Sequence, residues 1–278
     1  MTPHPLRTAL DALYSEYNRP DCIHPDPLEF LHRYESKADR EIAGFVASVL
    51  AYGRVRQILG SVETILDGMG PSPSAFLGVC SQQQLRSTFN GFKHRFTTGE
   101  EIACLLAGLS RTIRVHGSIE GCFASGWRES HENVLPALAR FVSELDGACG
   151  RRLAFLLPSP DHGSACKRLN LFLRWMVRRD RVDPGDWESV PASALIVPLD
   201  THMHRIALRT GLTARKQANL KAAVEITEAF RSICPEDPVR YDFMLTRIGM
   251  RSTAPDGSAP AHGEIPACLF SFSANRAK

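Results

Sequence analysis

The sequence predicts an all-α protein, on the basis of three observations. Apolar residues recur at helical spacing along most of the chain, strict strand-like alternation is rare, and short segments rich in proline and glycine separate the helical stretches. With 278 residues, 44% of them hydrophobic and 23% charged, the chain has the composition of a globular protein. It is long enough to bury a substantial core, as one large domain or as two lobes.

Each expected helix has its own stripe of apolar residues. The first covers residues 6–17. The second begins after Asp26, because an aspartate caps a first turn and Pro27 suits the first helical position. A third stripe covers residues 42–50. Further helical stripes run through residues 58–66, 102–113, 135–145, 169–176, 206–212, 220–230 and 241–248.

The breaks between helices predict how the chain is divided. A segment rich in proline and glycine at residues 158–163 predicts a break between helices, and we expect a lobe boundary near residues 158–164. We expect a central helical lobe of residues 40–166 and a second lobe formed by residues 1–39 together with 167–250. Residues 251–278 are rich in Pro, Gly, Ser and Ala, and they predict a C-terminal tail in loop conformation.

Composition argues against several classes of protein. No apolar run is long enough to cross a bilayer, and the N-terminus lacks the apolar core of a secretion signal, so we expect a cytoplasmic protein without a membrane partner. The eight cysteines are scattered without a C-x-x-C pair. A zinc ribbon or iron–sulfur cluster is therefore not expected, and the cysteines are expected to be mostly buried thiols.

Lys167 follows a turn and a candidate helix cap. Gly163 ends the turn and Ser164 is expected to be the N-cap, which makes Lys167 the third residue of the helix. The positive field of a helix N-terminus disfavours an ammonium ion and favours the neutral amine, the nucleophilic form of lysine. An ordinary lysine is only about 0.1% neutral at pH 7.4. The alternative is a solvated lysine lying along its helix, which is the commoner role of this residue.

Asp200 stands where another helix begins. A helix cap explains it fully, because capping contributes about 1 kcal/mol and requires only a side-chain oxygen. The nearby His202 and His204 allow a different hypothesis, a metal-dependent hydrolase that uses Asp200 and an H-x-H pair. Residues i and i+2 diverge by about 200° on a helix, and the apolar spacing here is helical, so the sequence favours no metal site.

The charge distribution leaves the partner open. The net charge is +3, and two basic runs begin at Lys167 and at Arg205. Such runs suit a polyanionic partner, but solvated helix faces produce the same pattern.

The segment around Asp200 resembles a signature of the helix-hairpin-helix DNA glycosylase superfamily. The chain reads L-D-T-H-M-H-R-I from Leu199 and R-T-G-L from Arg209, and endonuclease III-like members have V-D-T-H-V-x-R-(I/V)-x-x-R-x-G. The resemblance implies a two-lobed helical fold with a cleft between the lobes and a hairpin-like turn before the lysine helix. It also implies that Asp200 and Lys167 are catalytic. Their separation of 33 positions (200 − 167) is closest to the archaeal 8-oxoguanine glycosylase branch.

Two more segments carry the resemblance. Residues 43–57 resemble the helix and loop that probe the DNA strand, and residues 241–249 resemble the segment that presents an acid, here Asp242, to the damaged base. Thr246 stands where that branch has an aromatic stacking residue. The chain from about residue 5 to 250 also resembles an uncharacterised bacterial family that we associate with the superfamily. Two features depart from the pattern, because the hairpin is longer and lacks its first glycine, and the four-cysteine cluster is absent.

The resemblance implies a base-excision glycosylase with β-lyase activity, acting on an oxidised purine such as 8-oxoguanine. It implies damaged duplex DNA as partner, a nucleoid-associated location, no obligate protein partner and no metal or organic cofactor. The implied substrate-binding residues are Tyr52, Gly53, Arg54, Gln57, His202, Asp242 and Trp175, although Trp175 also fits an apolar core stripe. The implied contacts to the DNA backbone are Gly163, Ser164, Arg168 and Arg205. The alternatives are a non-catalytic DNA-binding protein of the same fold and the metal-dependent hydrolase.

Overall fold

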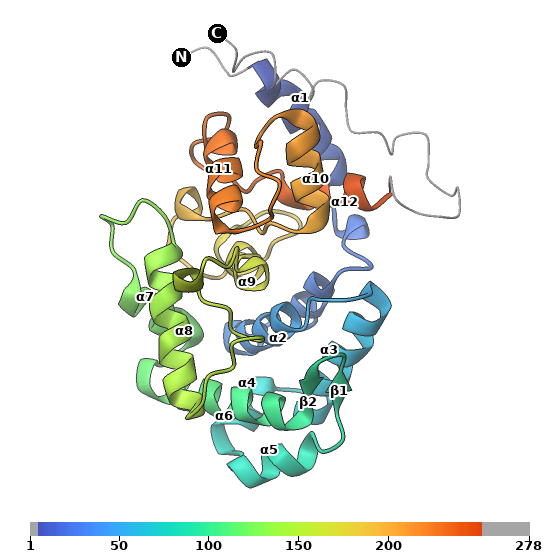
Figure 1. The fold of residues 1–278 in the computed structure, drawn as a ribbon. Helices are drawn as coiled ribbons and strands as arrows, with labels where there is room; N and C mark the ends of the chain where they lie inside the picture. Colours follow the sequence, from blue (N-terminus) through green and yellow to red (C-terminus); the bar gives the residue numbers. More distant parts are fainter. Residues whose placement is uncertain (1–4, 252–278) are drawn as a thin grey trace.

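The computed structural model describes residues 5–251 and confirms the all-α prediction (Figure 1). In this part of the chain the single sheet is a two-stranded antiparallel hairpin, formed by β1 (Lys93–His94) and β2 (Thr97–Thr98). None of the helices in residues 5–251 is long and apolar enough to cross a bilayer. Arg251, the first residue of the predicted tail, is the last residue of a helix, and residues 252–278 of that tail lie outside the described residues.

The helices follow the predicted stripes closely. The α-helices up to the hairpin are α1 (Pro5–Tyr17), α2 (Lys37–Val49), α3 (Val55–Met69), α4 (Pro73–Val79) and α5 (Gln82–Thr88). Those after it are α6 (Gly99–His116), α7 (Ile119–Gly126), α8 (Leu135–Cys149), α9 (Lys167–Val177), α10 (Thr201–Thr210), α11 (Leu220–Arg231) and α12 (Asp242–Arg251). Four short 3₁₀ helices complete the order: η1 (Pro20–Cys22), η2 (Pro27–Arg33), η3 (Pro160–His162) and η4 (Ala192–Ala194).

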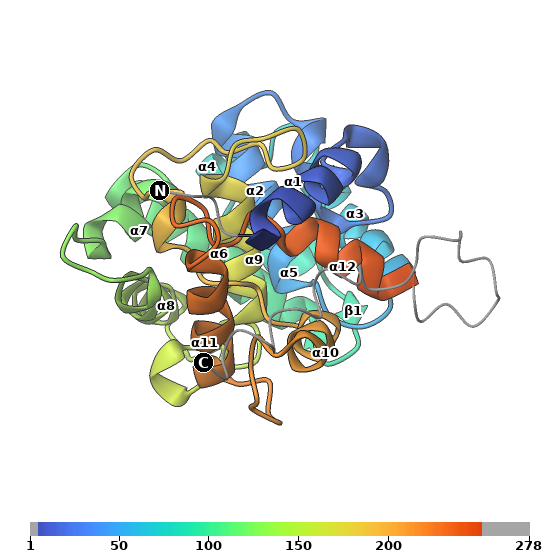
Figure 2. The same cartoon turned by 90° about the horizontal axis from the view of Figure 1, so that it is seen from above.

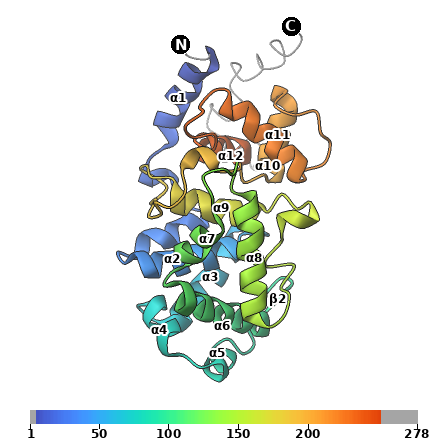
Figure 3. The ribbon, with the colours of Figure 1, turned by 90° about the vertical axis from the view of Figure 1, so that its left-hand side faces the viewer.

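The helices form two groups with α2 and α9 between them. Figures 1 and 3 show α4, α5 and α6 at one end, and α1, α10, α11 and α12 at the other. Helices α2 and α9 pack against each other in the middle, and α7 packs on α8 along one side. Seen from above, α1 and α12 lie next to each other, and α12 also packs on α10 (Figure 2). Helix α9, which carries Lys167, therefore lies between the two groups.

Local capping chemistry fixes several of the helix ends. Helix α6 begins with a capping box, because Thr98 accepts a hydrogen bond from the Glu101 backbone while the Glu101 side chain accepts one from the Thr98 backbone. It ends at Gly117 in the left-handed conformation, which glycine adopts without steric cost. The apolar stripes did not predict α4, α5 and α7. Each of them has a serine N-cap that marks its start, namely Ser72, Ser81 and Ser118.

The segment after Asp26 differs in detail from the predicted helix. Asp26 caps it as expected, with its Oδ1 atom accepting a hydrogen bond 3.0 Å long from the Leu28 backbone. The segment, however, is the 3₁₀ helix η2. It is seven residues long and buries four of them.

Aromatic side chains form the centre of the core where α2, α8 and α9 meet. The Phe45 ring lies edge-on to Phe172 of α9 at 5.4 Å and to Phe141 of α8 at 6.1 Å, measured between ring centroids. Phe172 in turn packs against Trp187 at 5.3 Å. All four side chains are buried. A fully buried aromatic side chain contributes about 1.5–3 kcal/mol, so this cluster holds α9 firmly in place.

Candidate active site

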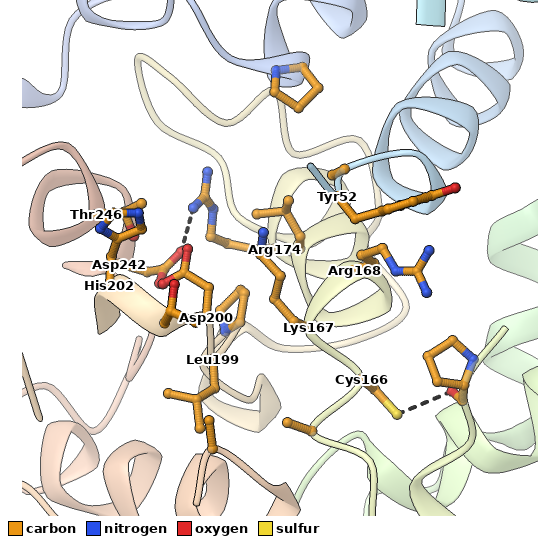
Figure 4. Close-up of a pocket in the computed structure, with 18 of the residues that line it drawn as sticks. Tyr52, Cys166, Lys167, Arg168, Arg174, Leu199, Asp200, His202, Asp242 and Thr246 are labelled. Carbon is orange, nitrogen blue, oxygen red and sulfur yellow. Dashed lines mark hydrogen bonds and ion pairs between the residues drawn. The ribbon is translucent and has the colours of Figure 1, made fainter. Parts of the chain in front are cut away.

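One pocket of about 930 Å³ opens beside α9. Its walls come from η2, the loop between α2 and α3, the start of α9, the start of α10 and the face of α12. Lys167, Asp200 and Asp242 all line it, and Figure 4 shows the lysine on one side and the two carboxyl groups on the other. The structure thus brings together an amine and two acids that are far apart in the sequence.

Lys167 is the first residue of α9, not the third. The N-cap position belongs to Cys166, whose φ of 46° lies in the left-handed region, and the predicted cap Ser164 instead accepts a hydrogen bond from the Cys166 backbone at 3.1 Å. The predicted start of the helix was wrong, because a serine whose hydroxyl accepts a hydrogen bond within its own loop cannot be told from a helix cap by sequence. Lys167 is partly exposed and makes no hydrogen bond or ion pair with any described residue. Its amine is therefore free to meet a ligand.

Cys166 fixes the position of the lysine. Its thiol is buried and lies 3.1 Å from the Pro158 carbonyl oxygen, to which it donates a hydrogen bond. Burial raises the pKa of this thiol to about 11, so it stays protonated at neutral pH. The contact ties the first turn of α9 to the segment before η3.

Asp200 caps α10 as predicted. Its Oδ1 atom accepts a hydrogen bond 2.8 Å long from the Met203 backbone, and the helix ends at Gly211 in the left-handed conformation. No described residue donates a hydrogen bond to its second oxygen, Oδ2. The cap therefore holds the carboxyl group in place while one oxygen remains available in the pocket.

Asp242 is buried in the pocket wall beside Arg174. The Arg174 Nη1 atom lies 2.6 Å from Asp242 Oδ2, and both side chains are only 3% exposed. The other oxygen, Oδ1, is buried and has no hydrogen-bond partner among the described residues. Burial, together with a smaller effect of the nearby Asp200 charge, raises the pKa of Asp242 to about 6 against the opposing effect of Arg174.

Arg174 belongs to a larger buried ion network. It also binds Asp183 at 3.0 Å, and Arg178 binds Asp183 from the next turn of the chain. Arg178 in addition contacts Asp180 and Asp237, each at 2.9 Å. The sequence indicated solvated helix faces or a polyanion contact for this basic run, but both arginines are buried and paired within the protein.

The network leads to a first testable prediction. Arg178→Ala should lower the free energy of unfolding by about 3–5 kcal/mol, because it leaves the fully buried Asp183 without one of its two cations. Urea denaturation followed by circular dichroism measures the change. The adjacent Arg179 is exposed, so Arg179→Ala should change the stability by no more than about 0.5 kcal/mol. Equal effects of the two variants would contradict the stabilising role of the network.

The predicted strand-probing segment is only partly in the pocket. Tyr52 and Gly53 line it, whereas Arg54 and Gln57 are exposed and lie outside its lining. The Tyr52 hydroxyl lies 2.7 Å from both the His94 carbonyl and Thr97 Oγ1, which attaches the loop to the β-hairpin. Gly53 has a φ of 101°, a conformation that favours glycine.

Two residues with implied contacts are held within the protein. Arg168 lines the pocket, but its Nη1 binds the Val49 carbonyl at 2.7 Å and its Nη2 binds the Phe155 carbonyl. Its guanidinium group also stacks over the Tyr52 ring at 5.0 Å, so it holds α9 against the neighbouring loops. Trp175 is fully buried in the core and does not line the pocket, since the apolar stripe of α9 turns it away.

The two histidines of the H-x-H pair point to different places. His202 lines the pocket, and its Nδ1 lies 3.1 Å from Arg205 Nη2. His204 is turned to the Arg215 carbonyl, 2.8 Å from its Nε2. In residues 5–251 no group of three or more His, Cys, Asp and Glu side chains is arranged to hold a metal ion. This geometry gives no support to the hydrolase hypothesis.

The remaining implied DNA contacts lie at the edge of the pocket or outside it. Gly163 and Ser164 line the pocket, and the Gly163 carbonyl accepts a hydrogen bond from Leu220 at the start of α11. Arg205 is exposed on α10 and does not line the pocket. The first two residues thus form part of the pocket wall, and Arg205 lies on the protein surface outside it.

The sequence reasoning missed Arg174, Asp26 and Arg247 as pocket residues. A signal existed for Arg174, because residues seven apart share a helix face and Lys167 is seven positions earlier. Asp26 was assigned only as a helix cap, and it also contacts Arg247 across the pocket wall at 3.3 Å. That contact spans more than 200 residues, so no local pattern could show it.

The fold and the pocket define an all-α protein with a lysine, a capping aspartate and a buried Asp–Arg pair around one cavity. The chain belongs to the DUF2400 family, described as proteins of unknown function, whose model matches residues 26–251. The matched region includes every pocket residue discussed above. No curated protein and no solved structure gives a significant match to the chain.

Proposed function

We propose that this protein is a DNA base-excision glycosylase with β-lyase activity, related to the helix-hairpin-helix DNA glycosylases. The observation that carries the proposal is that Lys167 and Asp200 line the same pocket. Lys167 is the first residue of α9, and Asp200 is the N-cap of α10. These are the two residues that the resemblance implies as catalytic. The pocket volume of about 930 Å³ is ample for a nucleotide that has been turned out of a duplex.

The environment of each residue supports its proposed role. The Lys167 side chain has no partner among the described residues, and a neutral lysine amine is the nucleophile that the proposed reaction requires. Asp200 is held by the Met203 backbone and keeps one oxygen free, as required of a carboxylate that stabilises positive charge on a sugar.

The proposed reaction begins when the damaged nucleotide enters the pocket. The neutral Lys167 amine attacks C1′ of the deoxyribose, and the bond from C1′ to the base breaks with its electron pair going to the base. The Asp200 carboxylate stabilises the positive charge that develops on the sugar and accepts a proton from the attached lysine nitrogen. The C1′–O4′ bond then breaks, O4′ takes the proton held by Asp200, and the lysine nitrogen and C1′ form a protonated Schiff base. Water accepts a C2′ proton, and the electron pair of that C–H bond expels the 3′ phosphate. None of these steps calls for a metal or an organic cofactor.

An oxidised purine such as 8-oxoguanine is the substrate that we propose. Asp242 and Thr246 both line the pocket, on one face of α12. Thr246 has no aromatic ring. Another side chain must therefore stack on the flipped base, or the stacking is weaker than in the archaeal branch.

Borohydride trapping tests the proposed function. Sodium borohydride reduces a Schiff base to a stable amine, so incubation with duplex containing 8-oxoguanine or an abasic site should give a covalent protein–DNA adduct. Peptide mapping should place the DNA on Lys167. Binding that weakens with salt but gives no adduct and no cleaved product on either duplex would instead support the non-catalytic DNA-binding protein.

A further inference from the structure

We propose that Asp242 is the general acid that protonates the departing base, with Arg174 as the positioning residue that stabilises the carboxylate left behind. This inference rests on the proposed function, since it concerns the base-release step of that reaction. It goes beyond contact with the base, because it assigns a proton transfer to a named oxygen.

The geometry of Asp242 divides its two oxygens between two tasks. Oδ2 is held by Arg174 at 2.6 Å, and Oδ1 is buried without any partner among the described residues. A buried polar atom without a partner costs about 1–3 kcal/mol, so such atoms call for an explanation in a ligand or a function. A proton on Oδ1 that is donated to a nitrogen or oxygen of a bound base satisfies both groups at once.

The electrostatics around Asp242 keep this proton available near neutral pH. Burial raises the pKa of the carboxyl group to about 6, and Asp200 and Asp183 add to that effect while Arg174 opposes it. General acids work best when their pKa lies near the working pH. Arg174, Asp183 and Asp200 act on Asp242 electrostatically. The other charged or titratable groups around it include the pocket-lining Asp26, Lys167, Arg168, His202 and Arg247, and Asp11 of α1, which packs on α12.

The step is balanced in atoms and charge. The lysine nitrogen forms its bond to C1′ while the bond from C1′ to the base breaks, and the leaving base takes the Oδ1 proton. The base departs neutral, and Asp242 becomes a carboxylate beside the Arg174 guanidinium, whose charge stabilises it. Asp200 accepts the proton of the lysine adduct, so the two acids perform separate roles.

The test compares two reactions of the same protein. Release of 8-oxoguanine from duplex DNA requires the base to leave, whereas borohydride trapping on an abasic duplex does not, because that substrate has no base. Asp242→Asn keeps the shape of the side chain but removes the proton. It should slow base release by about 10²-fold or more and leave abasic trapping within a few-fold of wild type. Asp67→Asn, an exposed aspartate on α3, is the matched control and should affect neither reaction.

The pH dependence gives a second readout that needs no variant. The acid is half protonated at its pKa of about 6, is largely protonated from about one pH unit below it, and loses its proton as the pH rises through that value. The rate of base release divided by the rate of abasic trapping should therefore be constant well below this pKa and fall about tenfold per pH unit well above it. The division removes the pH dependence of the lysine, which both reactions share. In Asp242→Asn the ratio should be independent of pH.

The outcomes separate this inference from the proposed function. Wild-type protein that forms no adduct with the abasic duplex overturns the proposed function, and this inference with it. The general-acid role alone is overturned if wild-type protein traps abasic DNA and releases the base, but Asp242→Asn releases the base at the wild-type rate. The same conclusion follows if the ratio of the two wild-type rates does not change with pH. Protein that traps abasic DNA but leaves 8-oxoguanine in place also overturns that role for this leaving group.

Discussion

Lys167→Gln is expected to reduce borohydride trapping to background on both 8-oxoguanine and abasic duplexes. No Schiff base can form without a primary amine at this position, and we expect base release to fall by roughly 10³-fold as well. The fold should survive the change, because Lys167 is partly exposed and bonds to no described residue. Removing a cation from the first turn of α9 should even raise the free energy of unfolding by about 0.3–1 kcal/mol.

A matched lysine separates this result from a general loss of DNA binding. Lys221 is exposed on α11 and does not line the pocket, so Lys221→Gln removes the same charge without touching the proposed nucleophile. This variant should trap DNA at close to the wild-type level. Trapping that survives in Lys167→Gln, with the adduct on another lysine, would remove Lys167 from the mechanism.

Local features of the site could be read from the sequence, and long-range ones could not. Asp200 was assignable as a cap because the signal lies within four residues, an acid directly before an amphipathic stripe. The start of α9 was misplaced by two residues, because Ser164 bonds within its loop and Cys166 takes a left-handed conformation that no propensity favours. The pairing of Lys167 with Asp200 rested on a family resemblance, since spacing alone does not bring two helix ends together.

The buried position of Arg174 in the pocket wall could not be predicted from the sequence pattern. Arg174 and Trp175 are neighbours in one amphipathic helix, yet one faces the pocket and the other the core. Because basic residues are usually solvated, composition favoured a surface role for Arg174. Its partners Asp183 and Asp242 lie 9 and 68 positions away in the sequence. The Asp242 pair forms only in the folded protein, in which α12 packs against α10. A buried ion pair across such a distance is a property of the tertiary fold.

The cap and the proposed catalytic role of Asp200 can be separated by choosing the substitution. Asparagine caps helices about as well as aspartate does, so Asp200→Asn should keep the hydrogen bond to Met203 and change the stability by less than about 0.5 kcal/mol. It removes the negative charge, however, and should lower both base release and abasic trapping by about 10²–10³-fold, the usual effect of losing one preorganised electrostatic group. Single-turnover kinetics and thermal unfolding of the same preparation measure both quantities.

A second cap provides the control for this experiment. Ser118 caps α7 by accepting a hydrogen bond 2.8 Å long from the Gly121 backbone, and it does not line the pocket. Ser118→Ala should cost about 1 kcal/mol of stability and leave both reactions unchanged. The two variants should therefore show opposite patterns, with activity lost at constant stability in one and stability lost at constant activity in the other. If Asp200→Asn keeps wild-type activity, the residue is a helix cap and nothing more, and the nucleophile would have to act without a carboxylate beside the sugar.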